Sequence, residues 1–284
     1  MTWRTQRVER RARLVPCEVC PEGMVYLRGG EFAMGSPEAE GSDDERPQHQ
    51  VTVGAFCIER TEVTVAAYGA CAARNACEAP GAHSTIPQDS GFFCNWRQDG
   101  REGHPVNCVS ALAAARYCAW RYPNGGNLPT EDQWEFAARG TAGRRYPWGD
   151  TPEPSPQIAN LCGSECSATV RGTWWGFRRG IEGWTDPWGA TAAVAALPHA
   201  GDTPEGIVGM AGNVWEWTRS PYGSYAARAG DATAYVRINN NLRIFRGGGW
   251  NDSDLSIART ANRHWNTPTE RYVYVGFRCI SEGR

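Results

Sequence analysis

The half of the chain after Thr141 contains no segment with the apolar spacing of an amphipathic helix. Gly, Pro, Trp and Asn dominate this half, and its apolar runs are long enough only for short strands. We therefore expect long loops held together by aromatic side chains and ions. With few helices, many loops and no internal repeat, the chain is predicted to be irregular α+β.

Three helices are expected in the first half. One follows Thr64 over residues 65–76, and one follows Ser110 over residues 111–122. The third begins after Thr130, where Thr130 and Gln133 form a capping box, and ends at Gly140. Short strands are expected around the turn Arg28–Gly30, at Met24 and Tyr26, at Phe32–Met34, and as one strand over Val51–Ile58.

Composition limits the organisation and the partners. Residues 1–16 are polar and Arg-rich, so we predict a tail there and a single domain over residues 17–284. No apolar run reaches the length of a membrane span, and a net charge of −2 favours neither nucleic acid nor an acidic membrane surface as partner. All 29 basic residues are arginines, which excludes Schiff-base chemistry and a phosphate-loop lysine.

Standard reaction centres are missing from the sequence. There is no H-E-x-x-H motif, no G-x-S-x-G elbow, no P-loop and no dinucleotide fingerprint. The histidines are not spaced as metal-binding pairs; they are His49, His83, His104, His199 and His264. Hydrolase, NTPase and dehydrogenase functions therefore have no support.

Eleven cysteines favour disulfides in an oxidising, extracytoplasmic compartment, periplasmic or secreted. The first residues are basic but lack the apolar segment of a signal peptide, so a cytoplasmic location stays open. Cys17, Cys20, Cys162 and Cys166 could together hold zinc, but their spacing is loose, so disulfides are the favoured outcome and zinc is the alternative. A short-loop bridge is expected among Cys71, Cys77 and Cys94.

Seven short motifs follow one another along nearly the whole chain. They are GGEFAMGS, PVNCVS followed by ARYCAW, LPTEDQWEFAARG, YPWGD, GMAGNVWEWT, RGGGWN and VGFRC. In this order they resemble the formylglycine-generating enzyme family, also called sulfatase-modifying factors. The resemblance implies a compact domain related to the C-type lectin fold, stabilising calcium ions, and a disulfide between Cys118 and Cys279.

The reactive positions of the family differ in this chain. Its enzymes hold Cu(I) between two cysteine thiolates and use O₂ to oxidise a substrate cysteine to formylglycine. Gly249 stands at the family's serine position, and Asp252 and Ile257 stand at the two cysteine positions. We expect no copper site and no formylglycine synthesis. The alternative is an oxidoreductase of this type with an altered metal site.

The resemblance implies one or two structural calcium sites of side-chain and carbonyl oxygens. The first would use Asn160, Leu161, Asp186 and Trp188. The second would use Gly212, Val214 and Glu216, and it lacks a side-chain ligand at Gly209, where the family usually has Asn or Asp. The alternative at this place is an internal hydrogen-bond network of Asn213, Glu216 and Trp217.

The segment between Trp250 and Tyr274 is rich in Asn, Asp, Ser, Arg and aromatic residues, and in the related fold it forms the wall of a cleft. Such residues suit ligand recognition by hydrogen bonding and stacking. Its composition also resembles the variable proteins of diversity-generating retroelements. The candidate ligand-binding residues are Asn251, Asp252, Asp254, Arg259, Asn262, Arg263, His264, Trp265, Asn266, Arg271, Tyr272 and Tyr274.

We therefore predict a non-catalytic, monomeric module that binds an unknown protein, peptide or small molecule. On this hypothesis Arg263 and Trp265 face solvent beside the cleft. The alternative is that the polar residues only hold loops together, with Arg246 and Arg278 buried in hydrogen-bonded networks.

Overall fold

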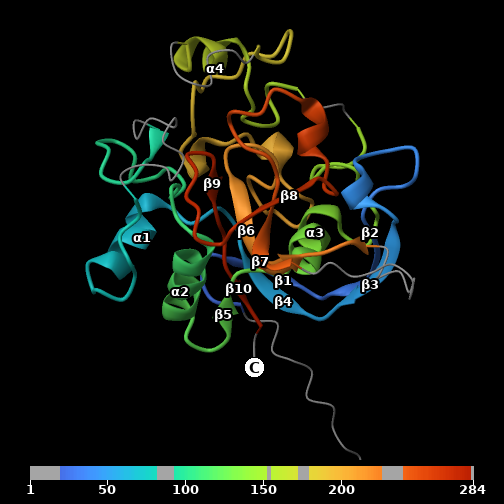
Figure 1. Cartoon of the computed structure of the whole chain (residues 1–284), viewed down its shortest axis with the longest axis horizontal. Coiled ribbons are helices and arrows are strands. Elements are labelled where there is room, and N and C mark those ends of the chain that lie inside the picture. The colour runs from blue at the N-terminus through green and yellow to red at the C-terminus, as the bar shows by residue number, and fades with distance from the viewer. Residues whose placement is uncertain (1–19, 82–92, 152–154, 172–178, 226–238, 283–284) are drawn as a thin grey trace, which may run out of the picture.

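The computed structural model describes residues 20–81, 93–151, 155–171, 179–225 and 239–282 (Figure 1). The predicted tail over residues 1–16 and Cys17 lie outside these ranges. The described chain has few helices and mostly short strands, which confirms the irregular α+β class. In the described residues no helix is both long and apolar enough to cross a membrane.

The strands are β1 (Met24–Leu27), β2 (Gly30–Met34), β3 (His49–Val53), β4 (Phe56–Glu59), β5 (Gly126–Asn127), β6 (Trp215–Tyr222), β7 (Asn239–Arg246), β8 (Arg263–Asn266), β9 (Val275–Gly276) and β10 (Ile280–Ser281). The α-helices are α1 (Val65–Ala72), α2 (Ala111–Arg121), α3 (Glu131–Arg139) and α4 (Ser164–Thr169). Short 3-10 turns include η1 (Asp43–Glu45), η4 (Val194–Ala196), η5 (His199–Gly201) and η6 (Leu255–Ala258).

The strands form two four-stranded sheets and one two-stranded sheet, ordered β1-β4-β10-β5, β8-β7-β6-β9 and β2-β3. All pairings are antiparallel except that of β6 with β9. The first sheet joins both ends of the described chain, because β10 lies between β4 and β5. In Figure 1, β6 and β7 cross the middle of the molecule, with α3 beside them and α4 at the top.

The three predicted helices are present because their caps are specific. Thr64 and Ser110 accept hydrogen bonds from the backbone N–H groups three residues on, and Thr130 and Gln133 form the predicted capping box. The first helix ends at Ala72 rather than near residue 76. The chain turns there, with Asn75 at a φ of 54°, before the Cys71–Cys77 disulfide closes.

The single strand predicted over Val51–Ile58 is wrong. The structure breaks it at Gly54 into β3, which pairs with β2, and β4, which pairs with β1 and β10. Close packing explains the break: a Cβ on Gly29 would lie 2.2 Å from the carbonyl oxygen of Val53. The two short strands predicted around the Arg28–Gly30 turn are confirmed as β1 and β2.

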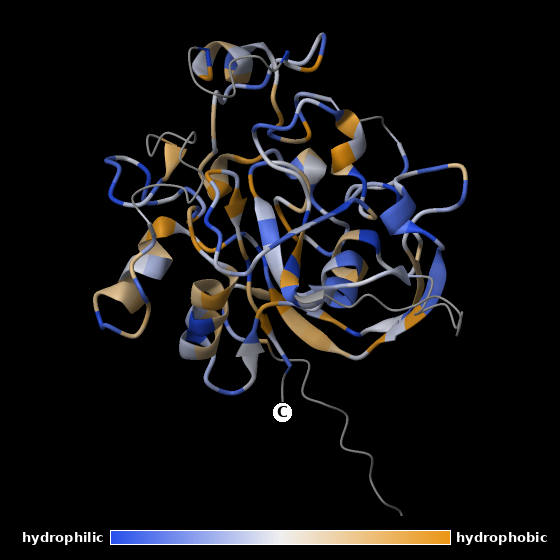
Figure 2. Cartoon of the chain, viewed as in Figure 1, coloured by the Kyte–Doolittle hydropathy of each residue, from blue (hydrophilic) through white to orange (hydrophobic). Residues whose placement is uncertain are grey.

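Three elements after Thr141 exceed the prediction. β6 and β7 are eight residues each, the longest strands in the described chain. The helix α4 has six residues, too few for a periodic apolar pattern, and a disulfide joins Cys162 to Cys166 at its start. Apolar residues gather on strands in the middle of the molecule, whereas hydrophilic residues are common on the outer loops (Figure 2).

Five disulfides cross-link the described chain and indicate an oxidising environment. They join Cys20 to Cys57, Cys71 to Cys77, Cys94 to Cys108, Cys118 to Cys279, and Cys162 to Cys166. The pairing of Cys118 with Cys279 is the one that the family resemblance implied. The predicted short-loop bridge is that of Cys71 with Cys77.

The disulfides should contribute to stability according to the loops that they close. Cys118–Cys279 spans 161 residues and Cys71–Cys77 spans six. Replacing the first pair by alanines should lower the free energy of unfolding by roughly 5 kcal/mol, and replacing the second by roughly 2 kcal/mol, because a longer loop restricts the unfolded chain more. Urea unfolding of both variants measures this, and a larger loss for the six-residue loop would contradict it.

Candidate functional site

The polar segment of residues 250–274 connects the two edges of one sheet. It leaves β7 after the RGG motif, passes through η6, and returns as β8, which pairs with β7. It then leads to β9, which pairs with β6 on the opposite edge. Side chains of this segment can therefore meet the sheet from both edges.

Asp252 is held in place by Trp215. Its Oδ2 accepts hydrogen bonds from Trp215 Nε1 at 2.7 Å and from the backbone N–H of Gly249 at 2.9 Å. Its carbonyl oxygen accepts from the N–H of Cys162 at 2.9 Å. The side chain is a fixed hydrogen-bond acceptor, and a carboxylate oxygen is a poor ligand for Cu(I).

Ile257 is a packing residue. It is half-buried against the main hydrophobic cluster. A Cβ on Gly248 would lie only 2.4 Å from the Cγ2 of Ile257. Gly248 has a φ of +80°, so both its conformation and this contact require glycine.

Every cysteine that the structure describes is in a disulfide. The disulfides that the sequence favoured over a zinc site are confirmed, because the sulfurs of Cys20, Cys162 and Cys166 are bonded to other sulfurs. A thiolate is required for zinc or Cu(I) binding, and a disulfide sulfur does not supply one.

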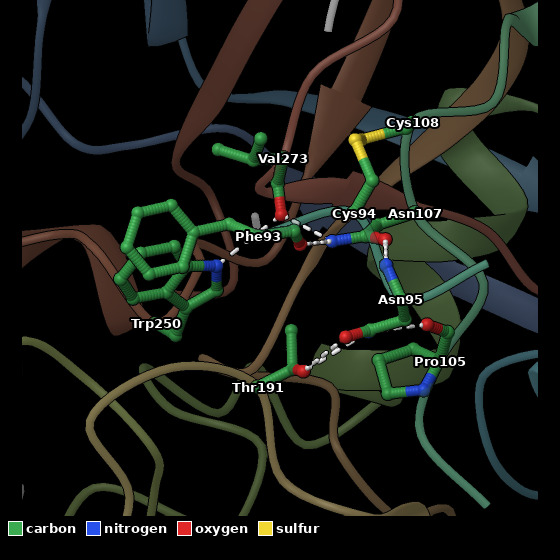
Figure 3. Close-up of a disulfide and its surroundings, with 9 residues drawn as sticks. All are labelled: Phe93, Cys94, Asn95, Pro105, Asn107, Cys108, Thr191, Trp250 and Val273. Atoms are coloured by element: carbon green, nitrogen blue, oxygen red, sulfur yellow. Dashed lines mark hydrogen bonds between the residues drawn. A yellow bond between two sulfur atoms is a disulfide. The ribbon is translucent and has the colours of Figure 1, made fainter. Parts of the chain in front are cut away.

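Trp250 and the Cys94–Cys108 disulfide pack together in one hydrophobic cluster beneath the polar segment (Figure 3). The indole N–H of Trp250 donates to the carbonyl of Val273 at 3.3 Å, and the Asn107 side chain donates to the same carbonyl at 2.5 Å. The beginning and the end of the polar segment are thus fixed to each other.

Arg263 does not face solvent, which corrects the prediction. Its side chain is fully buried, and Nε and Nη2 donate to the two carboxylate oxygens of Glu131 at 2.8 and 2.9 Å. Nη1 donates to the carbonyls of Asp44 and Gly223. The guanidinium is therefore occupied inside the protein by a fixed set of acceptors.

Arg259 is also a structural residue. Its Nη1 and Nη2 donate to Glu45 at 2.7 and 2.9 Å. Burial raises the pKa of Glu45, but hydrogen bonds from Arg259 and Ser36 outweigh it, and the pKa is lowered. The other predicted ligand-binding residues that are buried are Asn251, Asn262 and Tyr272.

Arg246 completes this ionic network. Its Nη2 donates to Glu131 at 2.9 Å, to Glu135 at 2.7 Å and to the hydroxyl of Tyr225 at 2.7 Å. Burial lowers the pKa of Arg246, but Tyr225 and the two carboxylates raise it above its ordinary value. The prediction of buried networks around Arg246 and Arg278 is confirmed.

His264 and Trp265 are exposed, in contrast to their neighbour Arg263. Their rings lie close to each other, with ring centres 6.4 Å apart. His264 stacks on Phe245 with ring centres 5.0 Å apart, and Trp265 packs on Tyr222 at 4.8 Å. The other exposed or partly exposed predicted residues are Asp252, Asp254, Asn266, Arg271 and Tyr274.

A polar cavity borders the segment at a different place. It has a volume of about 280 Å³ and is lined by Arg259 and Ala261 on one side and by residues such as Ser36, Gln48 and Arg145 on the other. His264 and Trp265 do not line it. The cavity and the exposed aromatic residues are thus two separate surfaces.

The structure brings the four residues of the first predicted calcium site together. Asp186 Oδ2 accepts from the N–H of Leu161 at 3.1 Å, and Oδ1 accepts from the N–H of Trp188 at 2.9 Å. Burial raises the pKa of the Asp186 carboxyl. Asn160 Nδ2 donates to Ala190 and Asn213, whereas its buried Oδ1 has no hydrogen-bond partner.

At the second predicted site, Glu216 is bound by protein donors. Its Oε1 accepts from Arg278 Nη2 at 2.7 Å, and its Oε2 accepts from Trp134 Nε1 at 2.7 Å. Asn213 lies between Gly212 and Val214 of the second predicted site and accepts a hydrogen bond from Asn160 of the first, and its Nδ2 donates to Glu62 at 2.8 Å. Asn213 and Glu216 thus take part in an internal network, whereas Trp217 donates elsewhere, to the carbonyl of Val109.

The predicted carbonyl ligands are mostly unused as acceptors. No hydrogen bond from a described residue reaches the carbonyl oxygens of Leu161, Trp188, Gly212 or Val214. Leu161, Gly212 and Val214 are buried and Trp188 is partly exposed. Buried carbonyl groups are nearly always hydrogen-bonded, so the open ones are compatible with a bound cation. In the part of the chain that the structure describes, no three acidic, His or Cys side chains are grouped to hold a metal, so carbonyls would have to supply most ligands.

The acidic partners of the buried arginines were not identified from the sequence. Glu131 and Glu135 lie four residues apart on α3 and so face the same side of the helix. They belong to the LPTEDQWEFAARG motif, where their spacing around the apolar Trp134 is the signal that could have indicated their burial. Glu62 had no such signal.

The comparisons with known proteins agree with this fold. Residues 12–283 match the family described as "Sulfatase-modifying factor enzyme 1-like domain". The chain belongs to this family, which contains the formylglycine-generating enzymes.

Both inactive and active relatives are similar to the chain. It is 32% identical to "Inactive C-alpha-formylglycine-generating enzyme 2" of Bos taurus, with 91% of this chain and 87% of the relative covered. It is 33% identical to "Formylglycine-generating enzyme" of Streptomyces coelicolor, with 92% and 89% covered. The overall likeness therefore does not separate the two kinds of relative.

Solved structures show the same fold. PvdO from Pseudomonas aeruginosa has a TM-score of 0.69 at 26% identity, with 91% of this chain and 94% of that chain covered. Treponema denticola variable protein 1 has a TM-score of 0.62 at 17% identity, with the same shares covered. The second likeness concerns the fold alone.

Replacing Arg263 tests whether it is structural. Arg263→Ala should lower the free energy of unfolding by about 3–5 kcal/mol, because it leaves the Glu131 carboxylate buried with one guanidinium fewer. Arg271→Ala is the matched control: Arg271 pairs with Glu78 at the surface, and its loss should cost at most about 1 kcal/mol. Chemical unfolding of both variants measures this, and equal small losses would refute the structural role.

Proposed function

We propose that this chain is a non-catalytic member of the family that binds a protein or peptide through the exposed residues of β8. The observation that carries the proposal is the state of the sulfur atoms: all ten cysteines among the described residues are in disulfides. The family's reaction needs two thiolates, and by the resemblance Asp252 and Ile257 stand at their positions. The Asp252 carboxylate accepts a hydrogen bond from the Trp215 indole, and the Ile257 side chain packs against the main hydrophobic cluster.

The exposed residues support a binding role. Trp265 is 38% exposed and is one of two large hydrophobic side chains on the described surface. Its position is fixed, because Tyr222 packs against it and Arg263, two residues earlier on β8, is buried in an ion pair. A rigid aromatic side chain contributes much contact area at little entropy cost, which is typical of binding hot spots.

The arrangement of buried and exposed residues on β8 is also consistent with a variable protein of a diversity-generating retroelement. We propose this as a special case of the binding function. The buried Arg263 is fixed by ion pairs, whereas His264 and Trp265 are exposed. Changes at the two exposed positions would alter the binding surface and leave the network intact. Positions of this kind are what a diversifying element requires.

We further propose that calcium stabilises the fold and that the protein acts outside the cytoplasm, in the periplasm or after secretion. The unused carbonyls of Leu161, Trp188, Gly212 and Val214 and the unpaired Oδ1 of Asn160 fit a hard cation. Such an ion would neutralise buried oxygens and cross-link loops. The five disulfides support an oxidising compartment.

Binding can be tested with a phage-displayed library of random peptides. Peptides enriched on the wild-type protein should bind Trp265→Ala at least about tenfold more weakly, because the aromatic anchor is lost. The melting temperature should change much less than in Arg263→Ala, because Trp265 lies at the surface, outside the buried ionic network. Leu112→Ala is the control, because Leu112 is 55% exposed on α2 and lies away from β8. Peptides that bind both variants like the wild type would sink the β8 assignment.

The absence of catalysis is tested by oxygen consumption with Cu(I) or Fe(II) and a cysteine-containing peptide. We expect no uptake above a metal-only blank and no aldehyde in the peptide, because no described cysteine offers a thiolate. Metal-dependent turnover would instead support the alternative, an oxidoreductase with an altered metal site. Glu135→Gln is unsuitable as a control, because it disturbs the buried network.

A further inference from the structure

Glu62 has a buried carboxylate oxygen without a partner. The residue is 1% exposed and precedes α1. Its Oε1 accepts from Asn213 Nδ2 at 2.8 Å, across 151 residues of sequence, whereas Oε2 has no hydrogen-bond partner. An unpaired carboxylate oxygen in the interior is costly unless a cation or proton compensates it.

The unpaired Oε2 of Glu62 lies beside Gly209, the position at which the second predicted calcium site lacks a side-chain ligand. A Cβ on Gly209 would lie 2.8 Å from Glu62 Oε2. A side chain at position 209, such as the Asn or Asp usual in the family, would begin in the space that the Glu62 carboxylate occupies. The Glu62 carboxylate and a side chain at position 209 would therefore occupy the same space, and either one could supply the ligand there.

The charges around Glu62 are unbalanced. Arg278 is fully buried and interacts with the carboxylates of Glu59, Glu62 and Glu216. When these are ionised, three negative charges face one positive charge, and one divalent cation would balance the remainder. Glu59 and Glu216 already accept hydrogen bonds on both of their oxygens, so Glu62 alone has an oxygen to offer.

We propose that Glu62 supplies the side-chain ligand of the second calcium site in place of residue 209. The carbonyls of Gly212 and Val214, on either side of Asn213, supply neutral oxygens beside it. The inference rests on the proposed calcium binding and adds the residue that completes the site. The ion would connect the turn before α1 to the loop before β6, two parts of the chain that are far apart in sequence.

The experiment measures calcium stoichiometry and affinity by equilibrium dialysis of the full chain, with tryptophan-sensitised terbium emission as a second probe. Wild-type protein should bind two ions. Glu62→Gln should keep one and bind the other about 10–100-fold more weakly, because a charged ligand is lost. Glu59→Gln is the matched control, because it removes the same charge at a carboxylate whose oxygens are both hydrogen-bonded.

A compensating pair protects the test against a variant that fails to fold. In Glu62→Ala combined with Gly209→Asp, the carboxylate comes from the other segment and the contact with Glu62 is removed. Gly209 has a φ of +69°, which Asp tolerates better than most residues. This double variant should bind two ions, whereas Glu62→Ala alone should bind one.

The results separate this inference from the calcium proposal. If wild-type protein binds no calcium, both fail. If it binds two ions and Glu62→Gln also binds two with unchanged affinity, calcium binding stands and the role of Glu62 is refuted. The role is also refuted if Glu59→Gln loses the second ion to the same extent, since the effect would then be one of charge alone.

Discussion

The buried ion pairs between α3 and the strands β7 and β8 determine the geometry of the candidate site. Glu131 receives hydrogen bonds from both Arg246 and Arg263, and Glu135 receives one from Arg246. In the interior a carboxylate or guanidinium without its partner is strongly unfavourable, so these elements have one relative placement. The chain has little regular secondary structure, and without these ion pairs the relative placement of its strands would depend on loops. The ion pairs make this part of the fold rigid. The exposed residues of β8 depend on this rigid part for their orientation.

The sequence predicted local structure better than charge placement. Helix caps at Thr64, Ser110 and Thr130 act within a few residues, so their effect was visible in the pattern. Arg263 was predicted to face solvent on the hypothesis that the polar segment binds a ligand. Its acidic partner Glu131 is 132 residues away, and no local pattern joins the two. The break of the predicted Val51–Ile58 strand had a similar cause, since it depends on contact with Gly29.

The candidate site shows how one fold carries different chemistry. The family match extends over nearly the whole chain, and inactive and active relatives are equally similar to it. At the two positions that the resemblance assigns to the family's cysteines, this chain has the Asp252 carboxylate, which accepts a hydrogen bond from an indole, and the Ile257 side chain, which packs on Gly248. Function therefore has to be argued from these groups rather than from the fold.

The Cys118–Cys279 disulfide has a consequence for a chain with so many exposed loops. It closes a covalent ring that contains α3, the residues of both predicted calcium sites, β6 to β9 and the whole polar segment. A protease that cuts one peptide bond inside this ring produces two polypeptides that stay joined through the two sulfur atoms. The cut protein would keep its strands together by covalent linkage as well as by packing. A single cleavage would therefore leave the exposed residues of β8 attached to the rest of the fold.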